Sequence, residues 1–230
     1  MFEARALMSG YGEVTVLKGL DFSVGREIFA ILGANGAGKS TLMKTIAKVL
    51  PLKAGEMSFK GTDVSNAAPY ELAHMGLAYV PQEQGVFPDL TVRENLAIGA
   101  LVGERPREER MEEVFELFPA LKPRGNQKAG SLSGGESQML AVGRALIQDP
   151  DLILLDEPTA GLAPKYVDGL FERMRDIHET RNVSVILTEQ NAAKTLAIAD
   201  RTMILSLGEV FLVDSAENID IESLKEGYKI

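Results

Sequence analysis

The chain contains 230 residues, of which 45% are hydrophobic and 25% charged, and its formal net charge at pH 7 is −9. Such a chain can bury a full core, as one large domain or two small ones, and its composition is that of a soluble globular protein. The acidic balance argues against a nucleic-acid-binding surface as the main function. The absence of cysteine excludes disulfides, thiolate metal sites and cysteine nucleophiles.

Neither a membrane-spanning segment nor a secretory signal is predicted. No apolar run approaches the roughly 18 to 20 residues needed to cross a bilayer, and residues 1–5 do not begin like a secretory signal. We therefore expect the protein to be made and kept in the cytoplasm.

The N-terminal part is predicted to form short strands and turns. Residues 14–22 and 56–59 have strand character and are punctuated by glycines. The apolar run 28–32 lies between Gly25 and Gly33, as expected of a buried parallel strand.

A helix is expected soon after that strand. Leu42, Ile46 and Val49 recur at helical spacing and predict a helix that begins near Lys39 and is stopped by Pro51. The segment therefore has the order strand, glycine-rich loop, helix.

The loop itself matches the phosphate-binding P-loop pattern. Its glycines let successive backbone N–H groups point inward at phosphates, and the positive end of the following helix dipole adds to that attraction. Lys39 can reach the β and γ phosphates, and the Ser40 hydroxyl can ligate Mg²⁺. A glycine-rich turn that merely resembles a P-loop is the alternative, and the flanking strand and helix disfavour it. The residues predicted to bind nucleotide here are Gly33, Ala34, Asn35, Gly36, Ala37, Gly38, Lys39, Ser40 and Thr41.

Helices dominate the middle of the chain. After a short strand at 77–80, Thr91 and Glu94 have the spacing of a capping box that begins a helix. A second helix is predicted from the apolar face formed by Met111, Val114, Phe115 and Phe118. We interpret the charged run 104–113 as the solvated side of that helix.

The C-terminal part returns to alternating strands and helices. Strands at 152–155 and 183–187 are separated by a helix over about 164–178, and a hairpin turns at Leu207-Gly208 between 202–205 and 210–213.

One α/β domain spanning residues 1–230 accounts for these elements. It would have a P-loop core with a mostly parallel sheet, an N-terminal antiparallel β subdomain and an inserted helical subdomain at about 84–150.

A second chemical motif follows the strand at 152–155. That strand ends in two carboxylates, the Walker B arrangement, in which Asp156 can hold Mg²⁺ directly or through water and Glu157 can polarise an attacking water. An ordinary acidic turn would explain this segment alone, but its pairing with the P-loop favours the catalytic interpretation.

Residues 131–136, Ser-Leu-Ser-Gly-Gly-Glu, predict another anion-binding helix start. A Leu-Ser-Gly-Gly-Glu segment between a P-loop and an apolar-Asp-Glu strand resembles the ATP-binding-cassette (ABC) ATPase family. The resemblance implies that two cassettes enclose two ATP molecules head to tail, with Ser133, Gly134 and Gly135 acting on the nucleotide of the opposing subunit.

The resemblance also assigns roles outside these motifs. Tyr11 matches the aromatic residue that stacks on adenine, with a plain turn tyrosine as the alternative. Gln82 matches the Q-loop glutamine, which touches Mg²⁺ and the attacking water; a polar loop residue is the alternative. Residues 87–96 resemble the surface that receives the coupling helix of a transmembrane subunit, although Phe87 would otherwise belong to the core.

Within the family, the chain looks most like the ATPase subunits of branched-chain amino acid importers. Three segments carry this narrower resemblance: 137–146, 161–164 and 188–192. Ala163 and Gln190 stand where most cassettes have Asp and His, and that branch shares both departures. Gln190 can donate an amide hydrogen bond but carries no charge, so the histidine's role at the γ-phosphate transfers only in part. Residues 82–85 and the C-terminal tail differ from that branch.

The resemblance implies an ATP-hydrolysing subunit that uses ATP and Mg²⁺ and works on the inner face of the cell membrane. Its implied partners are a transmembrane permease, a second ATPase subunit, identical or related, and indirectly an extracytoplasmic solute-binding protein. The alternatives are a soluble cassette ATPase that works on DNA or ribosomes, a non-hydrolysing nucleotide-dependent adaptor and a small P-loop kinase. The sequence does not name the solute.

Overall fold

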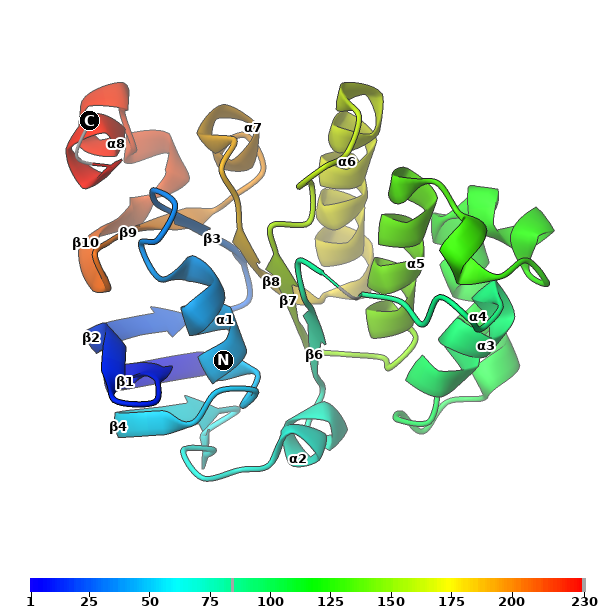
Figure 1. The fold of residues 1–230 in the computed structure, drawn as a ribbon, viewed down its shortest axis with the longest axis horizontal. Helices are drawn as coiled ribbons and strands as arrows, with labels where there is room; N and C mark the ends of the chain where they lie inside the picture. The colour runs from blue at the N-terminus through cyan, green and yellow to red at the C-terminus, as the bar shows by residue number, and fades with distance from the viewer. Residues whose placement is uncertain (84, 229–230) are drawn as a thin grey trace.

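Two sheets organise the molecule, for which the computed structural model describes residues 1–83 and 85–228 (Figure 1). The smaller sheet is antiparallel and has the order β2 (Val14–Val24), β1 (Phe2–Tyr11), β4 (Leu52–Phe59) and β5 (Thr62–Asp63). The larger sheet has the order β10 (Glu209–Ser215), β9 (Arg201–Ser206), β3 (Ile28–Leu32), β8 (Ser184–Thr188), β7 (Leu152–Asp156) and β6 (Leu77–Val80).

The larger sheet is parallel except for β10, which forms the predicted hairpin with β9. Every residue of β3, β7 and β8 is buried, because helices cover both faces of the sheet. The α/β fold with a mostly parallel sheet and an antiparallel N-terminal part is therefore confirmed.

Helix α1 (Lys39–Ile46) lies between the two sheets (Figure 1) and contacts β1 and β2 on one side and β7 and β8 on the other. Its buried Leu42, Met43 and Ile46 belong to a core cluster that includes Phe2 and Phe59 of the smaller sheet. This packing fixes the start of α1 at the edge of the larger sheet.

Helix α1 is shorter than the sequence predicts. The chain leaves the helix after Ile46, and Lys48 adopts a left-handed conformation with φ 59°. Val49 is consequently 57% exposed instead of lying on the buried face. The N–H groups of Val49 and Leu50 both donate to the Lys44 carbonyl, which ends the helix before Pro51.

The other face of the larger sheet carries the remaining core cluster, to which α5 (Gly134–Leu146) and α6 (Pro164–Arg181) contribute. The capping box that begins α3 (Val92–Gly99) is present, since the Glu94 N–H donates to the Thr91 hydroxyl and the Thr91 N–H donates back to the Glu94 carboxylate. The C-terminal helix α8 was not predicted. The helices are α2 (Pro69–His74), α3 (Val92–Gly99), α4 (Arg107–Leu117), α5 (Gly134–Leu146), α6 (Pro164–Arg181), α7 (Ala192–Leu196) and α8 (Ile221–Tyr228), with 3-10 turns at Pro119–Arg124, Ala129–Ser131 and Ala216–Asn218. None of the helices over 1–83 and 85–228 is long and apolar enough to cross a membrane.

The interpretation of residues 104–113 as a solvated helix side is wrong for Arg110. This side chain is only 3% exposed. Its guanidinium donates to the carbonyls of Ala100 at 3.0 Å, Val102 at 2.6 Å and Arg105 at 3.0 Å, and also to that of Ile147. Arg110 therefore closes the loop between α3 and α4 onto the end of α5.

We predict that Arg110→Met lowers the free energy of unfolding by about 2–4 kcal/mol, because it leaves several buried carbonyls without a donor. Urea denaturation measures the change. Arg107→Met on the same helix is the control: the Arg107 side chain is 55% exposed, and its loss should cost no more than about 0.5 kcal/mol. Equal effects of the two substitutions would contradict the role given to Arg110.

Candidate functional site

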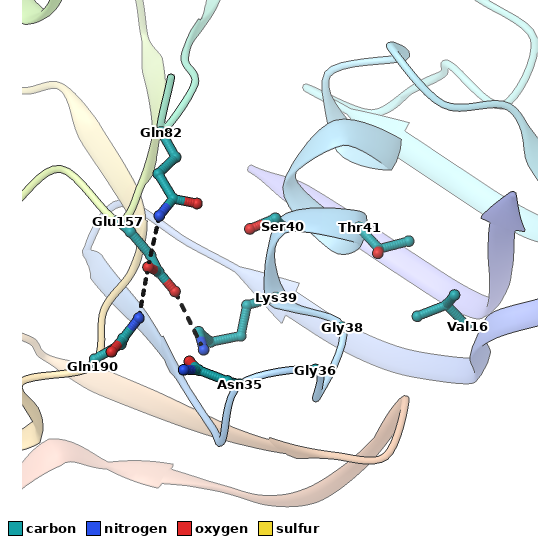
Figure 2. A pocket seen from close by; sticks show the side chains of 10 residues that line it. All are labelled: Val16, Asn35, Gly36, Gly38, Lys39, Ser40, Thr41, Gln82, Glu157 and Gln190. Carbon is teal, nitrogen blue, oxygen red and sulfur yellow. Dashed lines mark hydrogen bonds and ion pairs between the residues drawn. The ribbon is translucent and has the colours of Figure 1, made fainter. Parts of the chain in front are cut away.

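A pocket of about 490 Å³ opens where the parallel strands of the larger sheet end (Figure 2). The glycine loop joins β3 to α1, and single side chains reach the pocket from the segments after β6, β7 and β8. The lining residues are Val16, Asn35, Gly36, Gly38, Lys39, Ser40, Thr41, Gln82, Glu157 and Gln190. Most of the predicted site residues thus come together, from segments up to 155 positions apart in the chain, from Asn35 to Gln190.

The backbone of the glycine loop has the conformation that its glycines allow. Gly36 and Gly38 have φ values of 82° and 109°. A Cβ atom on Gly33 would lie 2.3 Å from the carbonyl oxygen of Leu205, so no side chain fits there. The Lys39 ammonium is folded back onto the loop, where it donates to the carbonyls of Gly33 at 2.9 Å and Ala34 at 3.3 Å.

Three nitrogen donors converge on the carboxylate of Glu157 (Figure 2). The amides of Gln82 and Gln190 donate to its Oε2 at 3.1 and 2.8 Å, and the Lys39 ammonium lies 3.4 Å from its Oε1. The Lys39 and Glu157 side chains are only 4% and 8% exposed. Glu157 itself has a φ of 47°, a conformation in which a non-glycine residue needs support from its surroundings.

The neighbouring carboxylate, Asp156, is held differently. Its Oδ1 accepts hydrogen bonds from the hydroxyls of Ser40 at 3.0 Å and Thr188 at 2.8 Å, and the Tyr79 hydroxyl donates to Oδ2 at 3.4 Å. Burial raises the pKa of Asp156, while the hydrogen bonds from Thr188 and Ser40 act in the opposite direction. The hydrogen-bonded side chains of Asp156 and Ser40 form an oxygen-rich group next to the nitrogen-rich surroundings of Glu157, and Ser40 lines the pocket.

Eight predicted site residues are not among those that line the pocket: Gly33, Ala34 and Ala37 of the glycine loop, Asp156, Tyr11, and Ser133, Gly134 and Gly135. Tyr11 is 47% exposed at the end of β1, although Val16 from the same hairpin reaches the pocket wall.

Ser133 caps α5 instead, in a capping box with Glu136 whose carboxylate accepts from the Ser133 N–H at 3.0 Å and from its hydroxyl at 2.9 Å. Ser133 and Gly134 are exposed, whereas Gly135 is buried and a Cβ atom there would lie 3.0 Å from the Tyr166 ring.

Sequence reasoning missed Thr188, Tyr79 and Glu189 as members of this region. Thr188 links the Asp156 carboxylate to the backbone of Glu157, because its hydroxyl donates to Asp156 at 2.8 Å and accepts from the Glu157 N–H at 3.0 Å. A signal for Thr188 existed: it directly follows the predicted strand 183–187, whose end lies beside that of 152–155 in a parallel sheet. The fully buried position of Glu189 has no comparable sequence signal.

Comparison with known proteins identifies the family. The family model described as ABC transporter matches residues 17–160. The chain belongs to the ABC transporter family. This ABC ATPase is 40% identical over 207 residues to the high-affinity branched-chain amino acid transport ATP-binding protein BraG of Pseudomonas aeruginosa, covering 89% of this chain and 88% of BraG. It is 35% identical over 221 residues to the probable branched-chain amino acid transport ATP-binding protein LivF of Archaeoglobus fulgidus, covering 95% and 94% of the two chains.

Solved structures agree with this assignment. The ADP conformation of MJ1267, an ATP-binding cassette of an ABC transporter, superposes with a TM-score of 0.87 at 27% identity and covers 100% of this chain and 98% of that one. A dimeric cassette, MJ0796 bound to ADP and Pi, is 24% identical with a TM-score of 0.84 over 95% of this chain and the whole of the other, and shows the shared fold. The protein is therefore an ATP-binding, ATP-hydrolysing subunit of an ABC transporter.

Glu189 gives this ABC ATPase a testable pH dependence. Burial raises the pKa of its carboxyl above the ordinary value of 4.5, although the N–H groups of Thr159 and Gln190 donate to it. A carboxyl whose pKa is higher in the folded state binds more protons when folded, so its contribution to stability is lost as the pH rises through the folded pKa. We predict that wild type loses stability relative to Glu189→Gln as the pH rises from 4.5 towards neutrality.

Thermal unfolding at closely spaced pH values measures this difference. Glu179→Gln, at an exposed position on α6, is the matched control and should follow wild type. Parallel pH profiles for wild type and Glu189→Gln would show that the buried carboxyl does not titrate in this interval.

Proposed function

We propose that this subunit binds ATP with Mg²⁺ in the described pocket and hydrolyses it at the interface with a second cassette, thereby energising solute uptake through a permease. The convergence of Lys39, Gln82 and Gln190 on the Glu157 carboxylate supports this most directly. It gives one carboxylate an oriented position beside a phosphate-binding loop, as a hydrolytic base requires.

The proposed nucleotide site consists of the glycine loop with Lys39, Ser40 and Thr41. The backbone N–H groups and the Lys39 ammonium would hold the phosphates, because the ammonium can turn from the Gly33 and Ala34 carbonyls to phosphate oxygens. Tyr11 is proposed to stack on adenine, since its exposed ring leaves it accessible.

The residues present fit a magnesium ion. The Ser40 hydroxyl and the Asp156 carboxylate supply hard oxygen donors that already lie 3.0 Å apart. Gln82 donates to the carboxylate of the next residue, Glu157. Proteins hold Mg²⁺ through few side chains together with phosphates and water, which is the kind of site that Ser40 and Asp156 offer. When bound, the ion would neutralise charge that develops on the phosphate oxygens.

Glu157 is proposed as the base that orients and polarises the attacking water. Gln82 and Gln190 both donate to its Oε2, so they orient the carboxylate and are proposed to contact the water and the γ-phosphate. An amide keeps the hydrogen bond of the histidine that most cassettes have at position 190, but it adds no positive charge.

A second cassette is proposed because residues of the Leu-Ser-Gly-Gly-Glu segment lie on the surface, outside the pocket of their own chain. Ser133 and Gly134 are exposed at the start of α5, outside the pocket of their own chain. Facing another copy or a related subunit, this helix start would offer N–H groups and the Ser133 hydroxyl to the partner's nucleotide.

The transport partners are proposed on the family assignment. The relatives named as branched-chain amino acid transport proteins favour branched-chain or other amino acids as the solute, a permease as the direct partner and a solute-binding protein as an indirect one. The protein would then be peripheral on the inner face of the membrane. We propose a helical subdomain at about 84–150 that carries the signature motif, with residues 87–96 as the surface that faces the permease. Residue 84, the first of this subdomain, lies outside the described residues.

Phe87 is the proposed permease contact. Its ring is 44% exposed, and its other side packs against Arg144 of α5, whose guanidinium lies 4.8 Å from the ring centroid. The buried side chain of Asn95 fixes the Phe87 backbone through hydrogen bonds of 2.8 and 3.0 Å. The loop is therefore held rigidly while the ring remains available.

The decisive experiment concerns the dimer. We predict that Glu157→Gln, which binds ATP but hydrolyses it slowly, doubles its solution mass when Mg-ATP is added, because trapped ATP joins two cassettes. Light scattering after size exclusion measures the mass. Ser133→Arg in the same background is the control and should remain monomeric, since it blocks the helix start that faces the partner's ATP.

A Glu157→Gln chain that binds ATP and stays monomeric would refute the homodimer and require a different cassette or the permease for closure. A dimer that persists in the Ser133→Arg control would refute the role of the signature. Copurification of the subunit from its native membrane, with identification of the attached permease, tests the solute.

For the permease contact we predict that Phe87→Ala lowers ATP-dependent solute uptake at least about tenfold, because a hot-spot aromatic is worth 2 kcal/mol or more at an interface. ATP binding by the isolated subunit should be unchanged. Solute uptake is measured in vesicles that contain the copurified transporter. Tyr70→Ala, which removes another exposed aromatic ring, is the control. Normal uptake by Phe87→Ala would place the permease elsewhere.

A further inference from the structure

A buried carboxylate lies next to the residues proposed to hydrolyse ATP but has no part in that proposal. Glu189 directly follows β8 and is only 2% exposed. Its backbone N–H donates to the Ile31 carbonyl at 3.4 Å, which ties the residue to β3 of the larger sheet. Removing a carboxylate from water costs free energy unless other hydrogen bonds replace those of water. The contacts of this carboxylate therefore show what it holds in place.

The two oxygens of the Glu189 carboxylate contact two different segments. Oε1 accepts from the Thr159 N–H at 3.0 Å, in the segment that follows β7. Oε2 accepts from the Gln190 N–H at 3.2 Å, in the segment that follows β8. An ionised carboxylate accepts hydrogen bonds on both oxygens, whereas a side-chain amide has only one accepting oxygen. Glu189 thus joins the segments that follow two neighbouring strands.

The first of these segments begins with Glu157, whose backbone is strained. Its φ of 47° lies in the left-handed region, which a non-glycine residue keeps only when its surroundings enforce it. The Glu157 N–H donates to the carbonyl and the hydroxyl of Thr188, at 3.1 and 3.0 Å, and its carbonyl accepts from the Ala160 N–H at 3.0 Å. Thr159 lies within the turn that this last hydrogen bond closes. The hydrogen bond from Thr159 to Glu189 therefore fixes the turn against the end of β8.

The second segment carries Gln190, whose side-chain amide donates to the Glu157 Oε2 at 2.8 Å (Figure 2). The direction of that amide depends on the backbone from which it extends, and the N–H of this backbone is the one that Glu189 holds. Glu189 consequently fixes the Glu157 carboxylate in two ways, through the turn after Glu157 and through the Gln190 side chain.

Folding stability does not account for the Glu189 carboxylate. Burial raises the pKa of this carboxyl above its ordinary value of 4.5, so at neutral pH the ionised group makes the fold less stable than its protonated form would. Groups with this effect are typical of functional sites, where a fixed geometry lowers stability.

We propose that Glu189 is a positioning residue for ATP hydrolysis, whose carboxylate holds the turn after Glu157 and the backbone of Gln190 so that the Glu157 carboxylate is aimed at the attacking water. Glu189 is not among the residues that line the pocket, and it acts through these two residues. The inference rests on the proposed role of Glu157 as the base. A small displacement of a base costs much of the rate, because proton transfer requires hydrogen-bond reach.

The test is Glu189→Gln, which keeps the size of the side chain but leaves one of the two N–H donors without an acceptor. We expect kcat for ATP hydrolysis by the copurified transporter to fall about tenfold, the effect of one lost hydrogen bond to a charged group. KM for ATP should be unchanged, because no contact of Glu189 with the glycine loop is involved. The melting temperature of the subunit at neutral pH should not fall, since a buried charge is removed together with the acceptor. Glu179→Gln, at an exposed position on α6, is the control and should change none of these quantities.

Glu189→Asp is a second variant that separates charge from reach. It keeps the carboxylate but is one methylene shorter, so it cannot contact both segments, and kcat should fall again. Hydrogen exchange supplies a further readout: in both variants the amides over 157–160 and 190–192 should exchange faster than in wild type.

A wild-type kcat in Glu189→Gln would overturn the inference. A fall in kcat that is matched by a fall in melting temperature would also overturn it, because that result indicates folding alone. Glu157→Gln separates the two levels of the argument. If Glu157→Gln hydrolyses ATP at the wild-type rate, the proposed base itself is wrong. If Glu157→Gln is inactive while Glu189→Gln keeps the wild-type kcat, only the role of Glu189 is wrong.

Discussion

The parallel sheet is the constraint on which the site depends. Adjacent strands that run in the same direction end at the same edge, so the residues that follow them meet although they are far apart in the chain. Gln82, Glu157 and Gln190 each follow a different strand, and all three reach one pocket with Lys39. The burial of the strands on both faces makes this edge rigid, so a few polar side chains can be held in fixed positions without covering loops.

The ion pair between Lys39 and Glu157 sets the electrostatics of the pocket. Both side chains are nearly buried, and charges in such surroundings require partners. Lys39 and Glu157 are each other's charged partner, loop carbonyls accept from the Lys39 ammonium, and the Gln82 and Gln190 amides donate to the Glu157 carboxylate. If Lys39 binds phosphate as proposed, the Glu157 carboxylate loses its cation. The Lys39–Glu157 pair would then link occupation of the proposed nucleotide site to the freedom of the proposed base.

The sequence predicted those features that depend only on residues close together in the chain. The glycine loop, the Thr91 capping box and the strand that ends in Asp156 need only neighbouring residues to be recognised, and the structure has all of them. Features that arise between distant segments were missed or misread. Arg110 looks solvated in a charged run and is buried because the loop between α3 and α4 and the end of α5 both turn carbonyls towards it. Thr188 acquires its importance only when β8 lies beside β7.

The helix start at Ser133 shows a second limit of prediction from one sequence. Its proposed role depends on a second chain, so contacts within this chain do not reveal it. Within this chain Ser133 forms its hydrogen bonds in a capping box with Glu136, and it is not among the residues that line the pocket. The packing of the Tyr166 ring against Gly135 nevertheless holds this helix start in a fixed orientation. A rigid, exposed helix start with small side chains is a surface prepared for close approach by an anion. If ATP binds in the pocket as proposed, this surface on a second chain could approach the nucleotide from outside the pocket. The separation of the Ser133 helix start from the pocket of its own chain is therefore the structural argument for the proposed association of two cassettes.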